Sequence, residues 1–247
     1  MWSGRFDIGD TWAAYAGPTD PNSTHAHVAL QLGVGVGADL RADIAGHPIS
    51  ARGVLIRPRA RHRVAADLDR VGFLYLEPQS PLGRCLLHLC GDAPAVALSG
   101  ELCDIVATEP RGAIPRLEAV LGVDPREDVL DPRLERALAR LAESDGGPGG
   151  VARAAAEVGL SASRLRAIAR AQLGVPLARW TLWRKLARAA RALASGATLA
   201  DAAATGRFAD QAHLARTMRE MFGITPRDAV EPLRSRTTPA HPSDSGA

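Results

Sequence analysis

Two stretches in the C-terminal half of the chain repeat one pattern about 48 residues apart, and they decide the fold of that half. Residues 155–176 are AAEVGLSASRLRAIARAQLGVP, and residues 203–226 are AATGRFADQAHLARTMREMFGITP. Each stretch predicts the end of a short Ala-rich helix, a tight turn, and a second helix that ends at a Gly with a Pro shortly after it. Small alanines in the first helix let the second helix cross close by, which is the packing of a helix-turn-helix.

The segment between the two units predicts one continuous helix over residues 177–194. At 1.5 Å per residue this helix is about 27 Å long. Two recognition helices on one side of B-DNA lie about 34 Å apart, and a rigid connector of this length is compatible with that spacing. Paired helical hairpins also occur as plain scaffold, which is the alternative interpretation.

The distribution of charge favours DNA binding over scaffold. The net charge is +3, but residues 1–130 carry 12 Lys and Arg against 16 Asp and Glu, whereas residues 131–247 carry 18 against 11. Residues 158–200 include eight basic side chains and no acid. Such a segment produces a positive field that attracts a polyanion. Charge alone would also fit a solvated helix face, so the repeat and the charge carry the interpretation together.

Residues 151–230 resemble the DNA-binding domain of AraC-type bacterial transcription regulators. The matching motifs are Gly159-Leu160-Ser161-Ala162-Ser163-Arg164-Leu165, Leu173-Gly174-Val175-Pro176, Arg184-Lys185-Leu186, Phe208-Ala209-Asp210-Gln211-Ala212-His213-Leu214 and Phe222-Gly223-Ile224-Thr225-Pro226. Asp131-Pro132-Arg133 and the leucines after it resemble the first helix of the same domain. The family usually has Gly directly before the aromatic residue of the second unit, where this chain has Arg207. If that position is left-handed, Arg207 costs about 1 kcal/mol relative to Gly.

The resemblance implies which side chains contact DNA. The base-facing positions are filled by Ser163, Arg166, Ala167 and Arg170 in the first unit, and by Gln211, Ala212, Ala215 and Arg216 in the second. Arginine bonds guanine bidentately and glutamine suits adenine, so Arg166 is the expected principal reader. The residues expected to contact phosphates, which position the protein without reading sequence, are Arg164, Arg184, Lys185, Arg188 and His213.

The N-terminal half alternates apolar and polar residues with a period of two from residue 25 to about residue 76. Short alternating strands with Gly and Pro turns predict a small antiparallel sandwich or barrel. Residues 82–121 predict short helices interrupted by prolines. His25-Ala26-His27, Gln31 and residues 53–62, which end in His62, resemble the two cupin motifs.

The cupin resemblance implies a divalent metal site at His25, His27 and His62 inside the barrel. Gln31 stands where that family has a Glu, and an amide is a poorer ligand than a carboxylate. The alternative is a vestigial motif whose histidines bond to the backbone. No other cofactor is expected.

The sequence therefore predicts an α+β protein in which a small cupin-like β-barrel precedes an all-α domain, whose two helix-turn-helix units are joined by a long helix. The expected domains are a sensor and dimerisation domain over 1–123, a DNA-binding domain over 128–232, and a disordered tail over 233–247.

The expected function is that of a sequence-specific transcription regulator, not an enzyme, controlled by a small-molecule effector in the barrel. The expected partners are double-stranded DNA, a second copy of the chain and, as a further possibility, RNA polymerase. The protein is expected in the cytoplasm and not at a membrane. Two alternatives are a cupin-type metalloenzyme with a helical appendage and an architectural DNA binder that senses nothing. The missing carboxylate counts against the enzyme.

Overall fold

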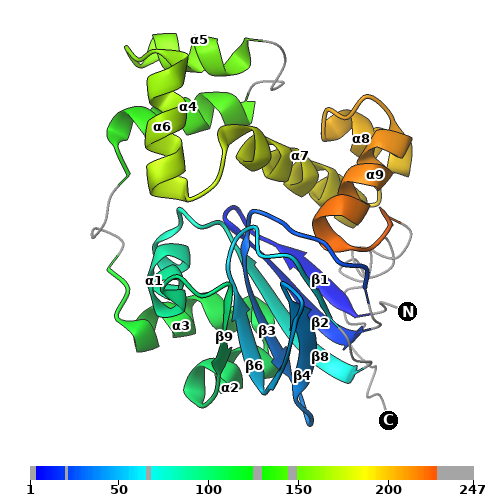
Figure 1. Ribbon diagram of the computed structural model, residues 1–247. Coiled ribbons are helices and arrows are strands. Elements are labelled where there is room, and N and C mark those ends of the chain that lie inside the picture. Colours follow the sequence, from blue (N-terminus) through cyan, green and yellow to red (C-terminus); the bar gives the residue numbers. More distant parts are fainter. Residues whose placement is uncertain (1–3, 20–21, 65–67, 125–129, 144–148, 227–247) are drawn as a thin grey trace, which may run out of the picture.

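The structure is a computed structural model that describes residues 4–19, 22–64, 68–124, 130–143 and 149–226. Antiparallel strands and three α-helices form the N-terminal half, and the C-terminal half is helical (Figure 1). The strands are β1 (Arg5–Ile8), β2 (Trp12–Thr19), β3 (Leu30–Gly35), β4 (Leu40–Ile44), β5 (His47–Ala51), β6 (Gly53–Ile56), β7 (His62–Val64), β8 (Leu68–Leu76) and β9 (Ala95–Leu98). They form a six-stranded sheet in the order β1-β2-β8-β3-β6-β9 and a three-stranded sheet in the order β5-β4-β7.

The six-stranded sheet is apolar on both faces. Leu30, Leu32 and Val34 of β3 point to the outer face, which is covered by helices. These helices are α1 (Pro81–Cys90), α2 (Glu101–Thr108), the 3-10 helix η1 (Pro110–Gly112) and α3 (Ala113–Leu121). Phe73 of β8 points to the inner face. Because side chains alternate along a strand, β3 places Gln31 on that inner face as well.

The expected barrel is not closed, because the two sheets remain separate. The three-stranded sheet lies near β9 and β3. On the side of β1, β2 and β8, helices of the C-terminal half cover the inner face, and their side chains join the same buried cluster. The apolar inner surface is thereby removed from water without additional strands, which is the physical reason that the sheet needs no closure.

Strand β9 lies in a region where the sequence predicts only short helices. Its residues, AVAL, are a short apolar run, and such a run does not distinguish strand from helix by periodicity. Antiparallel pairing with β6 makes it a strand. The helices that the sequence predicts around it are present as α1, α2 and α3.

The C-terminal half contains both predicted helix-turn-helix units and the predicted connector. Its helices are α4 (Pro132–Glu143), α5 (Gly150–Glu157), α6 (Ala162–Leu173), α7 (Leu177–Ala194), α8 (Leu199–Thr205) and α9 (Gln211–Phe222). The pairs α5–α6 and α8–α9 are the two units, and α7 is the connector. The predicted α+β class and the double helix-turn-helix architecture are confirmed. None of the helices in the described ranges is both long and apolar enough to cross a bilayer.

Two predictions about the limits of the domains fall largely outside the described residues. The boundary predicted between 123 and 128 overlaps residues 125–129, and the predicted tail over 233–247 lies wholly beyond residue 226. The last helix before the boundary ends at Leu121 and the next begins at Pro132, at positions compatible with the prediction.

Candidate functional site

Local sequence sets both ends of each recognition helix. The Ser161 Oγ accepts a hydrogen bond from the backbone N–H three residues later, at 3.2 Å, where α6 begins. Asp210 Oδ1 accepts the equivalent bond at 2.6 Å where α9 begins. Gly174 and Gly223 end the two helices with φ of +67° and +70°, a left-handed conformation that glycine adopts readily. The two helices are therefore capped in the same way, as expected of a repeat.

The side chains predicted to face DNA lie mostly on exposed surfaces of these helices. On α6, Ser163, Arg164, Arg166, Ala167 and Arg170 are exposed; on α9, Gln211, Ala212 and Arg216 are exposed, and His213 and Ala215 are half-buried. The opposite faces are buried through Leu165 on α6 and Leu214 on α9. His213 is half-buried because its ring packs edge-on against Phe208, with 5.3 Å between centroids.

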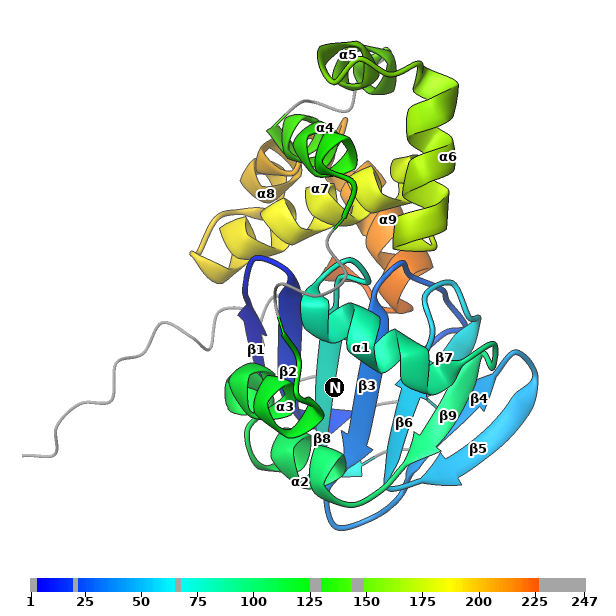
Figure 2. The ribbon, with the colours of Figure 1, turned by 90° about the vertical axis from the view of Figure 1, so that its left-hand side faces the viewer.

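The connector holds the two recognition helices apart. Figure 1 shows α6 at one end of α7, and α8 and α9 toward its other end, and Figure 2 also shows α6 and α8 at opposite ends of α7. Helix α7 is 18 residues long, as predicted, and keeps the two units apart. Consecutive major grooves on one side of B-DNA require such an arrangement.

Arg184 is half-buried and pairs with an acid of the N-terminal domain. Its Nη1 lies 2.8 Å from Oε1 of Glu77 in the N-terminal domain and donates to the Asp10 carbonyl at 2.8 Å. Burial raises the pKa of the Glu77 carboxyl, and the nearby Arg184 opposes that shift. Here the guanidinium pairs with a buried carboxylate, and the predicted phosphate contact at Arg184 stays a prediction. The two residues are 107 positions apart, so sequence reasoning missed Glu77.

The other two residues of α7 that are predicted to contact phosphates also contact protein groups. Arg188 Nη1 donates to the Ala142 carbonyl of α4 at 2.7 Å. Lys185 Nζ lies 5.3 Å from the centroid of the Phe208 ring. Both side chains are half-buried. They join α7 to its neighbours within the helical domain, and their predicted phosphate contacts stay predictions.

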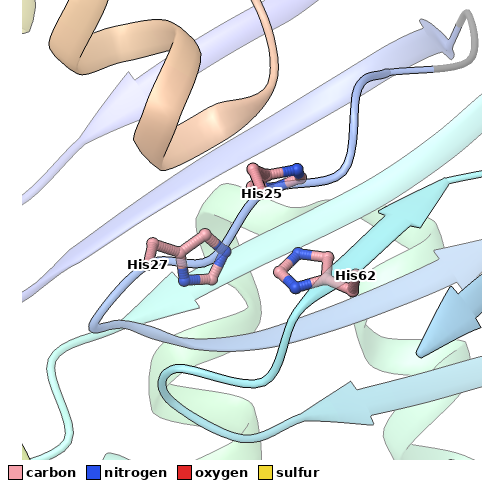
Figure 3. A group of neighbouring side chains, drawn as sticks. All are labelled: His25, His27 and His62. Atoms are coloured by element: carbon pink, nitrogen blue, oxygen red, sulfur yellow. The ribbon is translucent and has the colours of Figure 1, made fainter. Parts of the chain in front are cut away.

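The three predicted metal ligands come together (Figure 3). His25 and His27 precede β3, His62 begins β7, and all three are buried. One ring nitrogen from each lies within 4.8 Å of those of the other two. The backbones of His25 and His62 exchange two N–H···O hydrogen bonds of 2.9 Å, which align the two chain segments. We call these three side chains the histidine triad.

Hydrogen bonds determine which nitrogen of each ring carries the proton. Each Nδ1 lies beside a backbone carbonyl: that of Ser23 for His25 at 2.9 Å, Ala29 for His27 at 3.0 Å and Ala60 for His62 at 2.9 Å. A carbonyl oxygen only accepts, so each Nδ1 is assigned the proton and each Nε2 keeps its lone pair. This is the tautomer that a histidine uses when it binds a metal through Nε2.

Gln31 links two rings of the histidine triad. The Oε1 position of its amide lies 2.9 Å from Nε2 of His27 and 3.0 Å from Nε2 of His62. Because both ring nitrogens accept, this network requires the NH₂ group at that position, donating one hydrogen to each ring. Gln31 is therefore the partner that satisfies two buried lone pairs of the histidine triad.

Burial keeps these rings neutral. It lowers the pKa of His25 to about 3, with repulsion from His62 adding to the effect. The pKa of His27 is lowered well below its ordinary value by the same two causes, and burial lowers the pKa of His62. Neutral rings at pH 7 are what both the Gln31 hydrogen bonds and metal binding require.

Comparison with known proteins agrees with the geometry of the helical half. Residues 154–231 match a family model described as a helix-turn-helix domain. This match places an AraC-type helix-turn-helix domain at residues 154–231. No curated protein sequence matches the chain.

Two solved structures of one protein share the overall architecture of this chain, from the N-terminal sheets to the AraC-type domain. An apo structure of a ToxT variant from Vibrio cholerae is 11% identical, has a TM-score of 0.61, and covers 91% of this chain and 98% of the ToxT chain. Wild-type ToxT with bound unsaturated fatty acid is 10% identical, has a TM-score of 0.60, and covers 93% and 98%. An AraC-type regulator from Chromobacterium violaceum is 24% identical, with a TM-score of 0.38, over 42% of this chain and 93% of that chain. At the identities of the two ToxT structures, the similarity is one of fold.

The second unit of the AraC-type domain is docked on the N-terminal domain beside the histidine triad. The N–H and Oγ of Ser23 both donate to the Gly223 carbonyl, at 3.4 and 3.1 Å. The Phe222 ring lies 6.1 Å from that of His27 and 5.6 Å from that of Trp183, measured between centroids. The end of a recognition helix and a candidate metal site thus share one interface.

Proposed function

We propose that this chain is a sequence-specific transcription regulator that reads double-stranded DNA with the two recognition helices of its AraC-type domain. The observation that carries the proposal is that α6 and α9, which are capped alike and expose the predicted side chains, are held apart by the 18-residue α7. The net positive charge of residues 131–247 supports it, because a positive field attracts the phosphate backbone.

The proposed division of labour follows side-chain chemistry. Arg166 and Arg216 suit guanine and Gln211 suits adenine, and all three are exposed. Ser163, Ala167, Arg170, Ala212 and Ala215 complete the base-facing set. Arg164 and His213 remain the proposed phosphate contacts at the starts of the helices.

Replacing Arg166 tests the proposal. Duplexes selected from a random pool provide the cognate site, and titrations compare it with a scrambled duplex at fixed salt. Arg166→Ala should weaken cognate binding by about 1–3 kcal/mol and relax the preference at one position. Arg63→Ala, an exposed arginine of β7, is the control and should bind as the unchanged protein does. Equal loss on both duplexes would show that Arg166 contacts phosphate, and no selected sequence at all would overturn the proposal.

We propose further that the N-terminal domain senses a small molecule and holds two copies of the chain together as a dimer. The regulator acts in the cytoplasm, and RNA polymerase is a further proposed partner. The support is architectural: ToxT, which shares the fold, has been solved with an unsaturated fatty acid and with a naphthalenyl-butenoic acid. Small-molecule control by the N-terminal domain also explains why it is docked on a recognition helix.

A divalent metal at the histidine triad is a second candidate property of the N-terminal domain. The residues fit such an ion, because three neutral rings each bring a nitrogen within 4.8 Å of the others and each Nδ1 is held by a carbonyl. His25, His27 and His62 would hold the metal, and the Gln31 amide, turned over, would offer an oxygen. The ion would supply a structural link between the segment that precedes β3 and the start of β7.

Metal content tests this candidate. Protein purified without chelator should carry about one equivalent of zinc or a similar ion, and His62→Ala should remove it. His88→Ala, an exposed histidine of α1, is the matched control and should keep the metal. Protein that takes up no divalent ion on dialysis would leave the histidine triad as a hydrogen-bonded cluster only.

A further inference from the structure

A cavity of about 80 Å³ lies between the N-terminal domain and the second unit of the AraC-type domain. One wall is formed by Phe6 of β1, Tyr15 of β2 and Tyr75 of β8. The other wall is formed by Trp183 of α7 and Phe222 of α9. Figure 1 shows α7 and α9 over the ends of these strands. Because both domains contribute walls, the cavity exists only while they are docked.

Among the residues described, the cavity wall includes two acidic residues, Glu77 and Asp10, and the Asp10 carboxylate is fully exposed to solvent. The Glu77 side chain is only 4% exposed. Its Oε1 accepts from Arg184, and its Oε2 accepts from the Gln79 amide. Each carboxylate oxygen can accept two hydrogen bonds, so each can accept one more, from a ligand.

The arginines near these acids do not form part of the wall. Arg184 donates to Glu77 and to the Asp10 carbonyl. Arg191 donates to the Gly9 carbonyl and lies 3.5 Å from the Asp10 carboxylate. The Arg184 guanidinium therefore holds Glu77 in place, and the charged group that the wall presents to a ligand is the Glu77 carboxylate.

The rest of the wall is largely aromatic. Trp12 joins the five aromatic residues named above. The faces of such rings are electron-rich and attract cations, most strongly where water is excluded. A carboxylate ligand would instead meet the like charge of Glu77 and the negative faces of the rings.

We infer that this cavity binds a small apolar molecule that carries a protonated amine, with the ammonium group at Glu77 and the apolar part between the aromatic rings. The inference rests on the proposed sensing function and names the chemical class of the effector. Because the ligand touches both domains, it binds the docked arrangement only and stabilises it. The effector would thereby act on the position of α9.

The test uses the full chain without DNA and three probes of similar size and different charge. Isothermal titration calorimetry compares benzylammonium, benzyl alcohol and benzoate. Benzylammonium should bind about ten-fold more tightly than either of the others. Glu77→Gln should abolish this preference, Glu77→Asp should retain it, and Glu101→Gln, an exposed acid of α2, should leave it unchanged.

Three results would overturn the inference: tighter binding of benzoate, equal binding of all three probes, or no saturable binding of any. The comparison of probes in the unchanged protein decides the charge preference even if the Glu77 variants fail to fold. The DNA titration of Arg166→Ala is independent of these measurements, so the effector class and the proposed function can fail separately.

Discussion

Arg207 shows how a single residue stores strain in the second helix-turn-helix unit. Its φ is +58°, so the left-handed conformation that the sequence analysis considered for this position is present. Its guanidinium donates to the Glu143 carbonyl of α4 at 3.0 Å. A side chain that joins two helices thus occupies a position that backbone geometry would assign to glycine.

Substitutions at Arg207 separate strain from hydrogen bonding. Arg207→Ala and Arg207→Gly both lose the bond to Glu143, but only Gly relieves the left-handed strain, so the Gly variant should be more stable by about 1 kcal/mol. Urea unfolding measures the difference. At Arg63, in strand β7, the order should reverse, because Gly destabilises a strand relative to Ala. Equal stability of the two Arg207 variants would contradict the account.

Three buried histidines should make the metal-free protein sensitive to acid. The folded rings resist protonation, His25 down to about pH 3, whereas the same residues in the unfolded chain take up protons below about pH 6.5. Since the unfolded state then binds more protons, stability is lost as pH falls from about 6.5 towards 3. The free energy of unfolding, measured with chelator, should fall by up to about 1.4 kcal/mol per pH unit for each histidine. His27→Asn should give a shallower fall, and an unchanged slope would count against the neutral rings.

At the scale of elements, the recognition helices depend on signals within a few residues. Ser161 caps α6, so Ser161→Ala should lower the free energy of unfolding by about 1 kcal/mol. Ser50→Ala, at an exposed position of β5, is the control and should change it by less than about 0.5 kcal/mol. Denaturant titration measures both. Equal effects would mean that packing of Leu165, and not the cap, sets the start of the helix.

Other elements depend on distant partners. The capped and periodic helices α4 to α9 could be predicted from the sequence, but β9 could not, since four apolar residues become a strand only through pairing with β6. Closure of the barrel also could not be predicted. Alternation along each strand shows which residues share a face, but not whether strands or helices cover that face.

At the scale of the whole molecule, Gly223 has two roles: it ends helix α9, and it contacts the N-terminal domain. Substitutions can distinguish these two roles. A Cβ at Gly223 would lie 2.4 Å from the Ser23 carbonyl oxygen and 2.9 Å from His25 Nδ1. A Cβ at Gly174, which ends α6 with nearly the same φ, would meet no atom within 4 Å. Gly223→Ala and Gly174→Ala therefore carry the same backbone strain, and only the former disturbs docking.

The two variants should differ in domain arrangement. Hydrogen exchange at residues 22–25 should accelerate in Gly223→Ala and stay unchanged in Gly174→Ala, because only Gly223 contacts that segment. Small-angle scattering should show a larger radius of gyration for Gly223→Ala alone. If both variants keep the exchange rates and dimensions of the unchanged protein, the docked contact with Ser23 is not needed to hold the two domains together.

The sequence by itself determined the double helix-turn-helix domain and the side chains that its helices expose. Caps, helical periodicity and glycine stops act between residues a few positions apart, so they can be read without knowing the rest of the chain. The motif that places His25, His27 and His62 together could also be recognised there.

Only the tertiary structure decided where Arg184 points, what Gln31 does among the histidines, and which surface covers the open sheet. Each of these depends on partners brought together from distant parts of the chain, such as Arg184 and Glu77, which are 107 residues apart. The burial of a charge or a polar group is favourable only when such a partner is present. That partner is chosen by the packing of the two domains, and local sequence patterns do not record it.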